Sequence, residues 1–388
     1  MNRRRLAWLA AGIALAAAST LGLLAWRHQA PTLDQATLSG LTVQSGSFAR
    51  ADGPRSFNFP ADMGPHNNFQ TEWWYYTGNL SDASGRPFGF ELTFFRRALL
   101  GPSQWTARPS DWGTTQVYLA HFALSDIAGG QFHAFERFER GTAGLAGAQS
   151  APQFQVWLQD WAVQQTGDRQ YHLTARQGSL AVDLTLQDQT GPVLEGMQGY
   201  SQKGPDPGEA SYYFSQPRLN SRGTIIANGT SYDVTGSSWM DHEFSTSALS
   251  AGQVGWDWFS VQLSDGTELM VYDIRRQDGS PDPFSSGAVI GPDGQVRRLA
   301  ADDFSVAATA TWKSPHSGGT YPAAWTLTVP SEGLTLHLKP RLADQELNLS
   351  IVYWEGAVQV DGEKNGLPVS GTGYVELTGY GQSLQGQF

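Results

Sequence analysis

Two carboxylates sit in aromatic, strand-like segments where acid chemistry is plausible, Glu72 and Asp273. Burial among aromatic rings raises the pKa of a carboxyl group, whereas a neighbouring arginine lowers it. Glu72 is therefore a candidate acid, or else the partner of Arg96 or Arg97 in an ion pair. The sequence does not decide between these two roles.

The position of Asp273 follows from a predicted hairpin. Asp265-Gly266 is typical of a two-residue turn, which places Trp258 opposite Asp273 and Trp256 opposite Arg275. Side chains alternate along a strand, so these four share one face. That face either lines a ligand cavity or is solvated, with Trp256 stacked over Arg275 or Asp273 paired with Arg275.

Metal and cofactor chemistry receive no support. Asp241-His242-Glu243 has ligand-type residues, but consecutive residues of an extended chain point to opposite faces. The eight histidines are scattered without a His-x3-His pair, and the chain has no cysteine. We therefore expect no metal site, no thiolate chemistry and no cofactor. A Gly-x-Ser-x-Gly motif is absent, so a serine hydrolase of the α/β type is not expected.

The charge balance and the N-terminus bear on partners and location. Of 388 residues, 25 are basic and 36 acidic, a net charge of −11 that makes nucleic acid an unsuitable partner. Three arginines precede an uncharged, mostly apolar run from Leu6 to Trp26. Residues 1–30 are therefore predicted to be a signal peptide or a membrane anchor, and the rest to be periplasmic or otherwise extracytoplasmic, tethered or released.

The remaining chain is predicted to be all-β, with 44 glycines, 20 prolines and short aromatic, alternating segments. Residues 73–82 line up with residues 256–265 at one offset (256 − 73 = 183), and each copy ends in a double arginine. This repeat indicates two related units. We expect a linker or leading arm at 31–60 and two tandem antiparallel β units, barrels or sandwiches, at 61–244 and 245–388.

Several blocks resemble one family. His66, Thr71-Glu72-Trp73-Trp74-Tyr75-Tyr76-Thr77-Gly78-Asn79-Leu80 and the segment Phe88 to Arg96 resemble the start of the lipocalin-like family that contains carotenoid 1,2-hydratase (hydroxyneurosporene synthase) and AttH. Gly199 to Gly204, Ala210 to Ser215 and Ser238 to Phe244 resemble its later blocks. The resemblance covers roughly 60–388 and implies two packed lipocalin-like barrels. The Glu-Trp-Trp block is closer to the AttH-like side, whose members are also called predicted secreted hydrolases.

The resemblance also implies candidate catalytic residues. In the hydratase branch an acid protonates a terminal carotenoid double bond without a cofactor, and the acid candidates map to His242 and Asp273. Phe244 stands where the hydratase pattern has another aromatic, expected to be Trp, and Val271 stands where it has Tyr. We expect His242 and Asp273 to lie close together, beside Trp258 and facing a cavity in or next to the second barrel.

Three functions follow as hypotheses. The first is binding of an apolar or lipid-like ligand, because eight-stranded barrels hold one small ligand. The resemblance to AttH, which is named as an accessory component of an ABC transport system, implies ABC transporter subunits as partners. The second is a hydratase or hydrolase on the same scaffold, and the third is sugar binding on exposed tryptophans. The residues expected to contact the ligand are Glu72, Trp74, Tyr76, Trp239, Phe244, Trp256, Trp258 and Arg275.

Overall fold

The computed structural model describes residues 48–105, 110, 112–247 and 249–382. The predicted signal peptide or anchor at 1–30 and the first part of the leading arm, 31–47, lie outside the described residues. Within the described ranges, no helix has the length and apolar character needed to cross a membrane.

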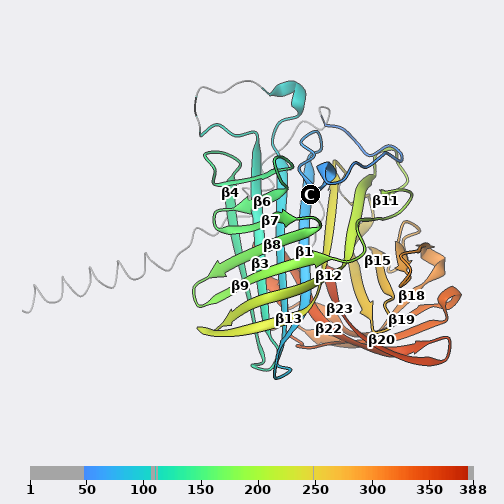
Figure 1. The fold of residues 1–388 in the computed structure, drawn as a ribbon. Coiled ribbons are helices and arrows are strands. Elements are labelled where there is room, and N and C mark those ends of the chain that lie inside the picture. The colour runs from blue at the N-terminus through green and yellow to red at the C-terminus, as the bar shows by residue number, and fades with distance from the viewer. Residues whose placement is uncertain (1–47, 106–109, 111, 248, 383–388) are drawn as a thin grey trace, which may run out of the picture. The chain divides into compact units, whose positions relative to one another are not determined.

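The first sheet is antiparallel and curls into a nearly closed barrel (Figure 1). Its strands run in the order β4-β3-β2-β1-β13-β12-β9-β8-β7-β6-β5, and β10 and β11 add to the side of β12. The bounds are β1 Thr71–Asp82, β2 Pro87–Ala98, β3 Gln116–Asp126, β4 Gln131–Arg140, β5 Ala146–Gln149, β6 Gln155–Leu158, β7 Trp161–Gly167, β8 Gln170–Gln177, β9 Leu180–Asp188, β10 Val193–Leu194, β11 Tyr200–Gln202, β12 Ala210–Ala227 and β13 Thr230–Ser245.

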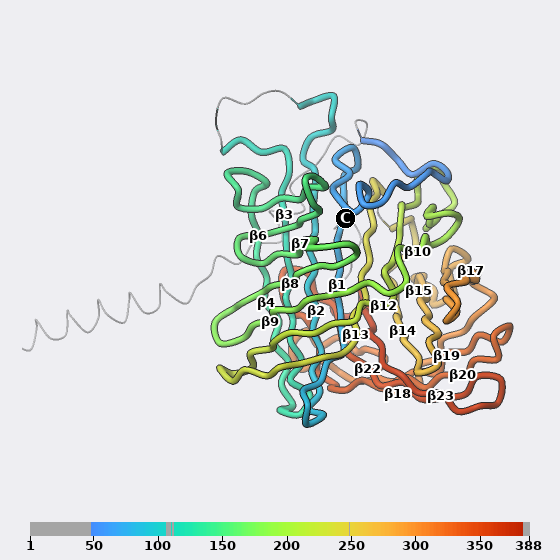
Figure 2. Tube along the Cα trace, viewed as in Figure 1, coloured from blue at the N-terminus to red at the C-terminus, as the bar shows by residue number. Residues whose placement is uncertain are grey.

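The second sheet is an antiparallel half-barrel in the order β17-β16-β15-β14-β23-β22-β20-β19-β18, with β21 beside β22. In Figure 2 the chain enters it after the yellow β13 and ends in the red β23. The bounds are β14 Gln253–Leu263, β15 Glu268–Arg276, β16 Ser286–Ile290, β17 Val296–Ala300, β18 Ser305–Lys313, β19 Thr320–Val329, β20 Leu334–Pro340, β21 Glu346–Asn348, β22 Val352–Lys364 and β23 Leu367–Thr378.

The prediction of an all-β chain with two barrel-like units is confirmed. In the described part of the chain the helical segments are single 3-10 turns. They are η1 Ala61–Met63, η2 Pro102–Gln104, η3 Ala301–Asp303 and η4 Pro330–Glu332.

The two sheets place the repeated hairpins in equivalent positions. β1 lies between β2 and β13, and β14 lies between β15 and β23. The equivalence extends outward, because β12 and β22 occupy the next place beyond β13 and β23. The sequence offset of 183 thus corresponds to a repeat of topology.

Strand alternation gives each sheet an inner face that fills its own core. In the first barrel the inner face includes Trp74, Phe94 and Met240, all fully buried. In the half-barrel it includes Phe259 and Val271. Because both interiors are filled by side chains, the calyx in which a lipocalin-like barrel would hold its ligand is occupied by core residues.

The outer faces of the two sheets pack against each other. A third apolar cluster combines residues of both sheets, among them Tyr75 and Tyr213 from the first and Trp258 and Tyr272 from the second. A side chain at Gly89 on β2 would bring its Cβ within 2.8 Å of the Ala357 Cβ on β22, so the absence of a side chain permits this close approach. The layer between the sheets is where the candidate site lies.

Candidate functional site

The hairpin register differs by one residue from the prediction. Trp258 lies opposite Tyr272, and Asp273 lies opposite Asp257. The predicted pairing of Trp258 with Asp273, and of Trp256 with Arg275, is therefore wrong. The turn has three residues, 264–266, because Leu263 pairs with Thr267, and Gly266 takes a positive φ of 87°. A three-residue loop with a left-handed glycine shifts the register and moves Asp273 to the opposite face from Trp258.

Asp273 and Arg275 lie on the same face of β15 as Val271, the face that points into the half-barrel. Asp273 accepts a hydrogen bond from Ser285 Oγ at 3.1 Å, and burial raises its pKa in spite of that bond and of Arg275. Arg275 donates to Asp257 at 2.9 Å and stacks over Tyr380 at 3.7 Å rather than over Trp256.

His242 and Glu72 lie within the first barrel. His242 Nε2 donates to Glu72 Oε1 at 2.8 Å, and Arg96 Nε donates to Glu72 Oε2 at 2.8 Å. His66 Nδ1 also donates to Glu72, and its Nε2 donates to Asp62 at 2.9 Å. Of the two roles left open for Glu72, the structure shows the ion pair with Arg96. The catalytic roles assigned to His242 and Asp273 stay predictions.

The electrostatics of this network follow from its partners. Burial opposes the charge of Glu72, but Arg96 and the hydrogen bonds of both histidines hold its pKa well below its usual range. Burial lowers the pKa of His242 to about 4, so its ring is neutral near pH 7. The two carboxylates that flank His66 outweigh its burial and raise its pKa.

Three side chains of this network are of types that can bind a metal ion. Ligand-type atoms of His66, Glu72 and His242 lie within 4.8 Å of one another. Both nitrogens, however, contact the same Glu72 oxygen directly at 2.8 Å, and ligands around a zinc ion at its usual bond lengths stand about 3.3 Å apart. The short contacts, together with Arg96 on the second Glu72 oxygen, fit shared protons better than an ion.

Three other predicted ligand residues of the first unit, Trp74, Tyr76 and Phe244, are core residues. Trp74 is fully buried and its Nε1 donates to the Met63 carbonyl. Tyr76 is fully buried in the same core, and Phe244 stacks against His66 with ring centroids 3.6 Å apart. They support the barrel and the Glu72 network rather than a cavity.

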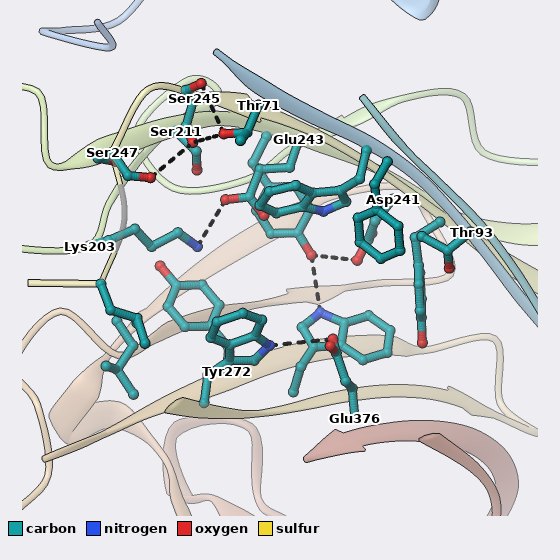
Figure 3. Close-up of a pocket in the computed structure, with 18 of the residues that line it drawn as sticks. Thr71, Thr93, Lys203, Ser211, Asp241, Glu243, Ser245, Ser247, Tyr272 and Glu376 are labelled. Atoms are coloured by element: carbon teal, nitrogen blue, oxygen red, sulfur yellow. Dashed lines mark hydrogen bonds and ion pairs between the residues drawn. The ribbon is translucent and has the colours of Figure 1, made fainter. Parts of the chain in front are cut away.

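A cavity does occur between the outer faces of the two sheets (Figure 3). Its volume is about 140 Å³. Trp256 and Trp258, two of the residues predicted to contact a ligand, line it, and Trp239 packs behind Trp258 with ring centroids 6.2 Å apart. Its wall consists of Thr71, Trp73, Tyr75, Thr93, Phe95, Lys203, Ser211, Tyr213, Asp241, Glu243, Ser245, Ser247, Leu249, Trp256, Trp258, Tyr272, Ile274, Ile351, Tyr353 and Glu376.

The repeat supplies both aromatic walls. Trp73 and Tyr75 of β1 are the sequence counterparts of Trp256 and Trp258 of β14, and all four line the cavity. Tyr75 and Trp258 meet edge to face, with ring centroids 5.2 Å apart. The two equivalent hairpins thus face each other across one site.

Asp241 is the most strongly hydrogen-bonded carboxylate of the cavity. It accepts from Tyr213 Oη at 2.6 Å, from Ser215 Oγ at 2.6 Å and from Trp239 Nε1 at 2.7 Å. Trp258 Nε1 in turn donates to Tyr213 Oη at 3.1 Å, a bond that joins the two sheets. Burial raises the pKa of Asp241 to about 7, although the three donors favour its charged form.

Glu376 stands on the facing sheet with fewer donors. Trp256 Nε1 donates to it at 3.3 Å. Burial, with a smaller contribution from Glu91 and other carboxylates, raises the pKa of Glu376 to about 8. Behind it Glu355 accepts from Tyr75 Oη at 2.7 Å, and burial and the neighbouring carboxylates raise its pKa well above its usual range. Glu376 is therefore predominantly protonated near pH 7.

One side of the cavity carries hydroxyl groups and a cation, as the labelled residues of Figure 3 show. Lys203 Nζ lies 3.4 Å from Glu243 and 3.8 Å from the centroid of the Tyr272 ring. The hydroxyl groups belong to Thr71, Ser211, Ser245 and Ser247. Glu376 and Thr93 lie on the other side.

Sequence reasoning missed Asp241, Tyr213, Glu376 and Tyr353. Asp241 could have been found from alternation, because its neighbour His242 points into the barrel and Asp241 must then point outward. Tyr213 lies in the family-like block Ala210 to Ser215, but that block does not show that its side chain enters a cavity. Glu376 and Tyr353 carry no local motif, since their position depends on how the two sheets pack.

The comparisons with known proteins place the chain in a family. Residues 50–380 match the family model described as AttH-like. A crystal structure of an AttH protein from Nitrosomonas europaea shares 34% identity with a TM-score of 0.75, covering 86% of this chain and 100% of that one. Kievitone hydratase from Nectria haematococca has the same fold, with 15% identity, a TM-score of 0.63 and coverage of 86% and 96%. No curated protein matches the chain. The family match over most of its length shows that this chain belongs to the AttH-like family.

Proposed function

We propose that the cavity between the two sheets binds a small, largely apolar molecule with aromatic or unsaturated carbon. The observation that carries this proposal is the aromatic wall contributed by both hairpins, with Trp73 and Tyr75 facing Trp256 and Trp258. Aromatic faces and edges pack well against other π systems. A mostly apolar cavity with a few placed polar groups is typical of small-molecule sites.

The charges of the wall favour a neutral ligand. Lys203 pairs with Glu243, and the raised pKa of Glu376 leaves that carboxyl group uncharged near pH 7. Asp241 retains part of its charge, but its oxygens already accept hydrogen bonds from three donors. An ion entering the cavity would find no free counter-charge among these groups, and leaving water would cost it free energy.

A fluorescent probe tests the binding proposal. N-phenyl-1-naphthylamine is neutral and aromatic, and we expect it to bind with one site per chain. Trp258→Ala should weaken binding about tenfold, the loss of one buried aromatic contact. Trp112→Ala is the matched control, because Trp112 is 63% exposed and is not part of the cavity wall. Equal affinity in the two variants would place the probe elsewhere and contradict the proposal.

A second candidate function is the addition of water to a carbon–carbon double bond. The specific observation is a protonated carboxyl group, Glu376, among aromatic rings and across from the Asp241 carboxylate. Glu376 would give its proton to one alkene carbon, and the aromatic faces and Asp241 would stabilise the positive charge on the other. Water then adds to that carbon and gives one proton to the Asp241 carboxylate, so one proton leaves Glu376 and one arrives at Asp241. Kievitone hydratase, which shares the fold, is by its name a hydratase.

Isotope incorporation tests the second candidate. Linear isoprenoid alkenes incubated with the protein in ¹⁸O-water should yield labelled tertiary alcohols. Glu376→Gln should abolish labelling while retaining the probe affinity of the wild type. Labelling that persists in Glu376→Gln would exclude this residue as the acid, and labelling abolished by Asp273→Asn instead would favour the sequence-based assignment.

Export and transporter partnership stay predictions. Protease accessibility in spheroplasts tests export, with the region after residue 30 expected to be cleaved. Co-purification with ABC transporter subunits from detergent extracts tests the accessory role.

A further inference from the structure

A chain of hydrogen bonds leads from the cavity to the edge of the first barrel. Tyr353 of β22 lines the cavity, and its Oη lies 2.7 Å from His121 Nδ1. His121 Nε2 lies 3.1 Å from Glu136 Oε2. Tyr353 and His121 are buried, whereas the Glu136 side chain is 16% exposed and also accepts hydrogen bonds from Ser350.

The partners determine which atoms carry protons. Hydrogen bonds from His121 and Ser350 outweigh burial and lower the pKa of Glu136, so it is a carboxylate that can only accept. His121 must then donate from Nε2. In the neutral ring Nδ1 is an acceptor, and the Tyr353 hydroxyl donates to it. This is the arrangement of a carboxylate, an imidazole and a hydroxyl that moves a proton away from the hydroxyl.

The surroundings of Tyr353 favour a hydroxyl group that passes protons on over a lasting phenolate. Burial, followed by the charges of Glu91, Glu355 and Glu376, raises the pKa of Tyr353 well above its usual range. A lasting phenolate is therefore disfavoured, and the hydroxyl must regain a proton whenever it passes one on. Glu91 is placed to supply it, since its Oε1 lies 3.4 Å from Tyr353 Oη and Thr93 donates to the same oxygen.

We propose that Tyr353, His121 and Glu136 form a proton relay that takes a proton from the cavity side and delivers it to the solvent-exposed edge. The proposal rests on the proton chemistry of the hydration function. One proton from a carboxyl group or a water enters at the Tyr353 oxygen, and the Tyr353 proton moves to His121 Nδ1. The imidazolium pairs with Glu136 and then releases its Nε2 proton through that carboxylate to water. The outward transfer leaves His121 with its proton on Nδ1. The first tautomer returns when Nε2 takes a proton from the solvent side and the Nδ1 proton passes back through Tyr353 to the deprotonated acid. Hydration consumes one proton from the acid and frees one from water, so one outward and one inward transfer together restore the starting state.

The repeat shows that the relay is not a by-product of the fold. Tyr213 is the topological counterpart of Tyr353, because Tyr213 pairs with Glu243 on β13 and Tyr353 pairs with Thr378 on β23. The Tyr213 hydroxyl donates to Asp241 inside the cavity instead of to a histidine. His121 lies on β3, and the equivalent place on β16 is taken by Ser286.

The test measures proton exchange at Glu91, which is fully buried and adjoins the relay. After dilution into D2O at mildly acidic pH, infrared spectroscopy follows the carboxyl band that disappears in Glu91→Gln. We expect Tyr353→Phe and His121→Gln to slow its exchange about tenfold or more. Glu136→Gln should slow it as well, because the imidazolium loses its counter-charge while the shape is kept.

Two matched controls separate the relay from general packing. Tyr374→Phe removes another buried hydroxyl beside Glu355 and Glu91, and His172→Gln removes a histidine that pairs with Asp183 at 2.8 Å on the exposed face. Both should exchange at the wild-type rate. Equal rates in Tyr353→Phe, Glu136→Gln and Tyr374→Phe would overturn the relay, and this comparison decides the case if His121→Gln fails to fold.

The probe titration keeps this proposal separate from the proposed function. His121 and Glu136 are not part of the cavity wall, so His121→Gln and Glu136→Gln should bind N-phenyl-1-naphthylamine as the wild type does. If the wild type does not bind the probe, but Glu91 exchange is still slower in the relay variants, ligand binding is contradicted and the relay is supported. Normal binding with unchanged exchange rates would do the reverse.

Discussion

The two halves of the cavity wall place a carboxyl group at equivalent positions and give it different surroundings. Asp241 lies opposite Tyr75 on β1, and Glu376 lies opposite Trp258 on β14. The next strand supplies Ser215 as a donor to Asp241 but supplies another acid, Glu355, beside Glu376. The repeat therefore fixes where the two carboxyl groups stand. The neighbouring strand determines that Asp241 accepts three short hydrogen bonds, whereas Glu376 accepts one long bond from Trp256 and stands beside a second acid.

The arginine that ends each repeated hairpin shows the same divergence. Arg96 and Arg275 are counterparts, since Phe94 and Asp273 occupy the same register position two residues earlier. Arg96 is 1% exposed and binds Glu72 within the barrel. The Arg275 side chain is 21% exposed and binds Asp257. Equivalent residues thus serve a buried network in one unit and a half-buried pair in the other.

The largest effect is expected from the arginine pair. Arg96→Met leaves the buried charge of Glu72 without its main partner and should lower the free energy of unfolding by about 4 kcal/mol. Arg275→Met should cost about 1 kcal/mol, because the Arg275 side chain is 21% exposed and Asp257 keeps the hydrogen bond from Tyr380. Urea unfolding followed by circular dichroism measures both. Similar costs would show that the two arginines are not energetically different.

Asp241 and Glu376 should differ next. Asp241→Ala removes the acceptor of three buried donors and should destabilise the protein by about 3 kcal/mol. Glu376→Ala removes a group with a single long hydrogen bond and should cost less than about 1 kcal/mol. The same unfolding measurement applies, and a larger cost for Glu376→Ala would reverse the assignment of the two roles.

The pH dependence of stability sharpens the comparison further. The folded-state pKa of Glu376, about 8, lies above its ordinary value of 4.5. The folded protein therefore binds the proton more tightly, and this contribution to stability is lost as pH rises toward 8. Asp241, with a folded pKa of about 7, acts in the same direction. His242 acts in the opposite direction, and only as pH falls from about 6.5 toward 4.

Unfolding midpoints at mildly acidic and mildly alkaline pH measure this dependence. The wild type should lose stability as pH rises. Glu376→Gln mimics the protonated acid, so its stability relative to the wild type should rise by roughly 2 to 3 kcal/mol from the acidic end to the alkaline end. Glu363→Gln, on an exposed position of β22, is the control and should follow the wild type. A parallel pH profile in Glu376→Gln would show that Glu376 is not protonated in the folded protein.

The smallest difference is expected between the two tryptophan counterparts. Trp256→Phe loses the hydrogen bond to Glu376 as well as ring area, whereas Trp73→Phe loses ring area. We expect about threefold and about twofold weaker binding of N-phenyl-1-naphthylamine, respectively. Fluorescence titration measures both, and a stronger effect at Trp73 would shift the ligand toward the first sheet.

The fold could be predicted from the sequence, but only part of the candidate site could. The aromatic repeat at offset 183 predicted two related units, because the same hairpin pattern must pair in the same way in each. The site depended on register, and Asp265-Gly266 was interpreted as a two-residue turn when Ser264 also belongs to it. That one residue exchanged the faces of Trp258 and Asp273. The contact between Tyr353 and His121 joins residues 232 positions apart, for which no local pattern exists.

None of the cavity-lining side chains belongs to the core of either barrel-like unit. Substitutions in the wall would therefore change the cavity while both interiors keep their packing. A ligand bound there would contact two independently filled units at once, so its binding energy would add to the adhesion between them. The layer between the sheets would then be held more tightly when occupied than when empty.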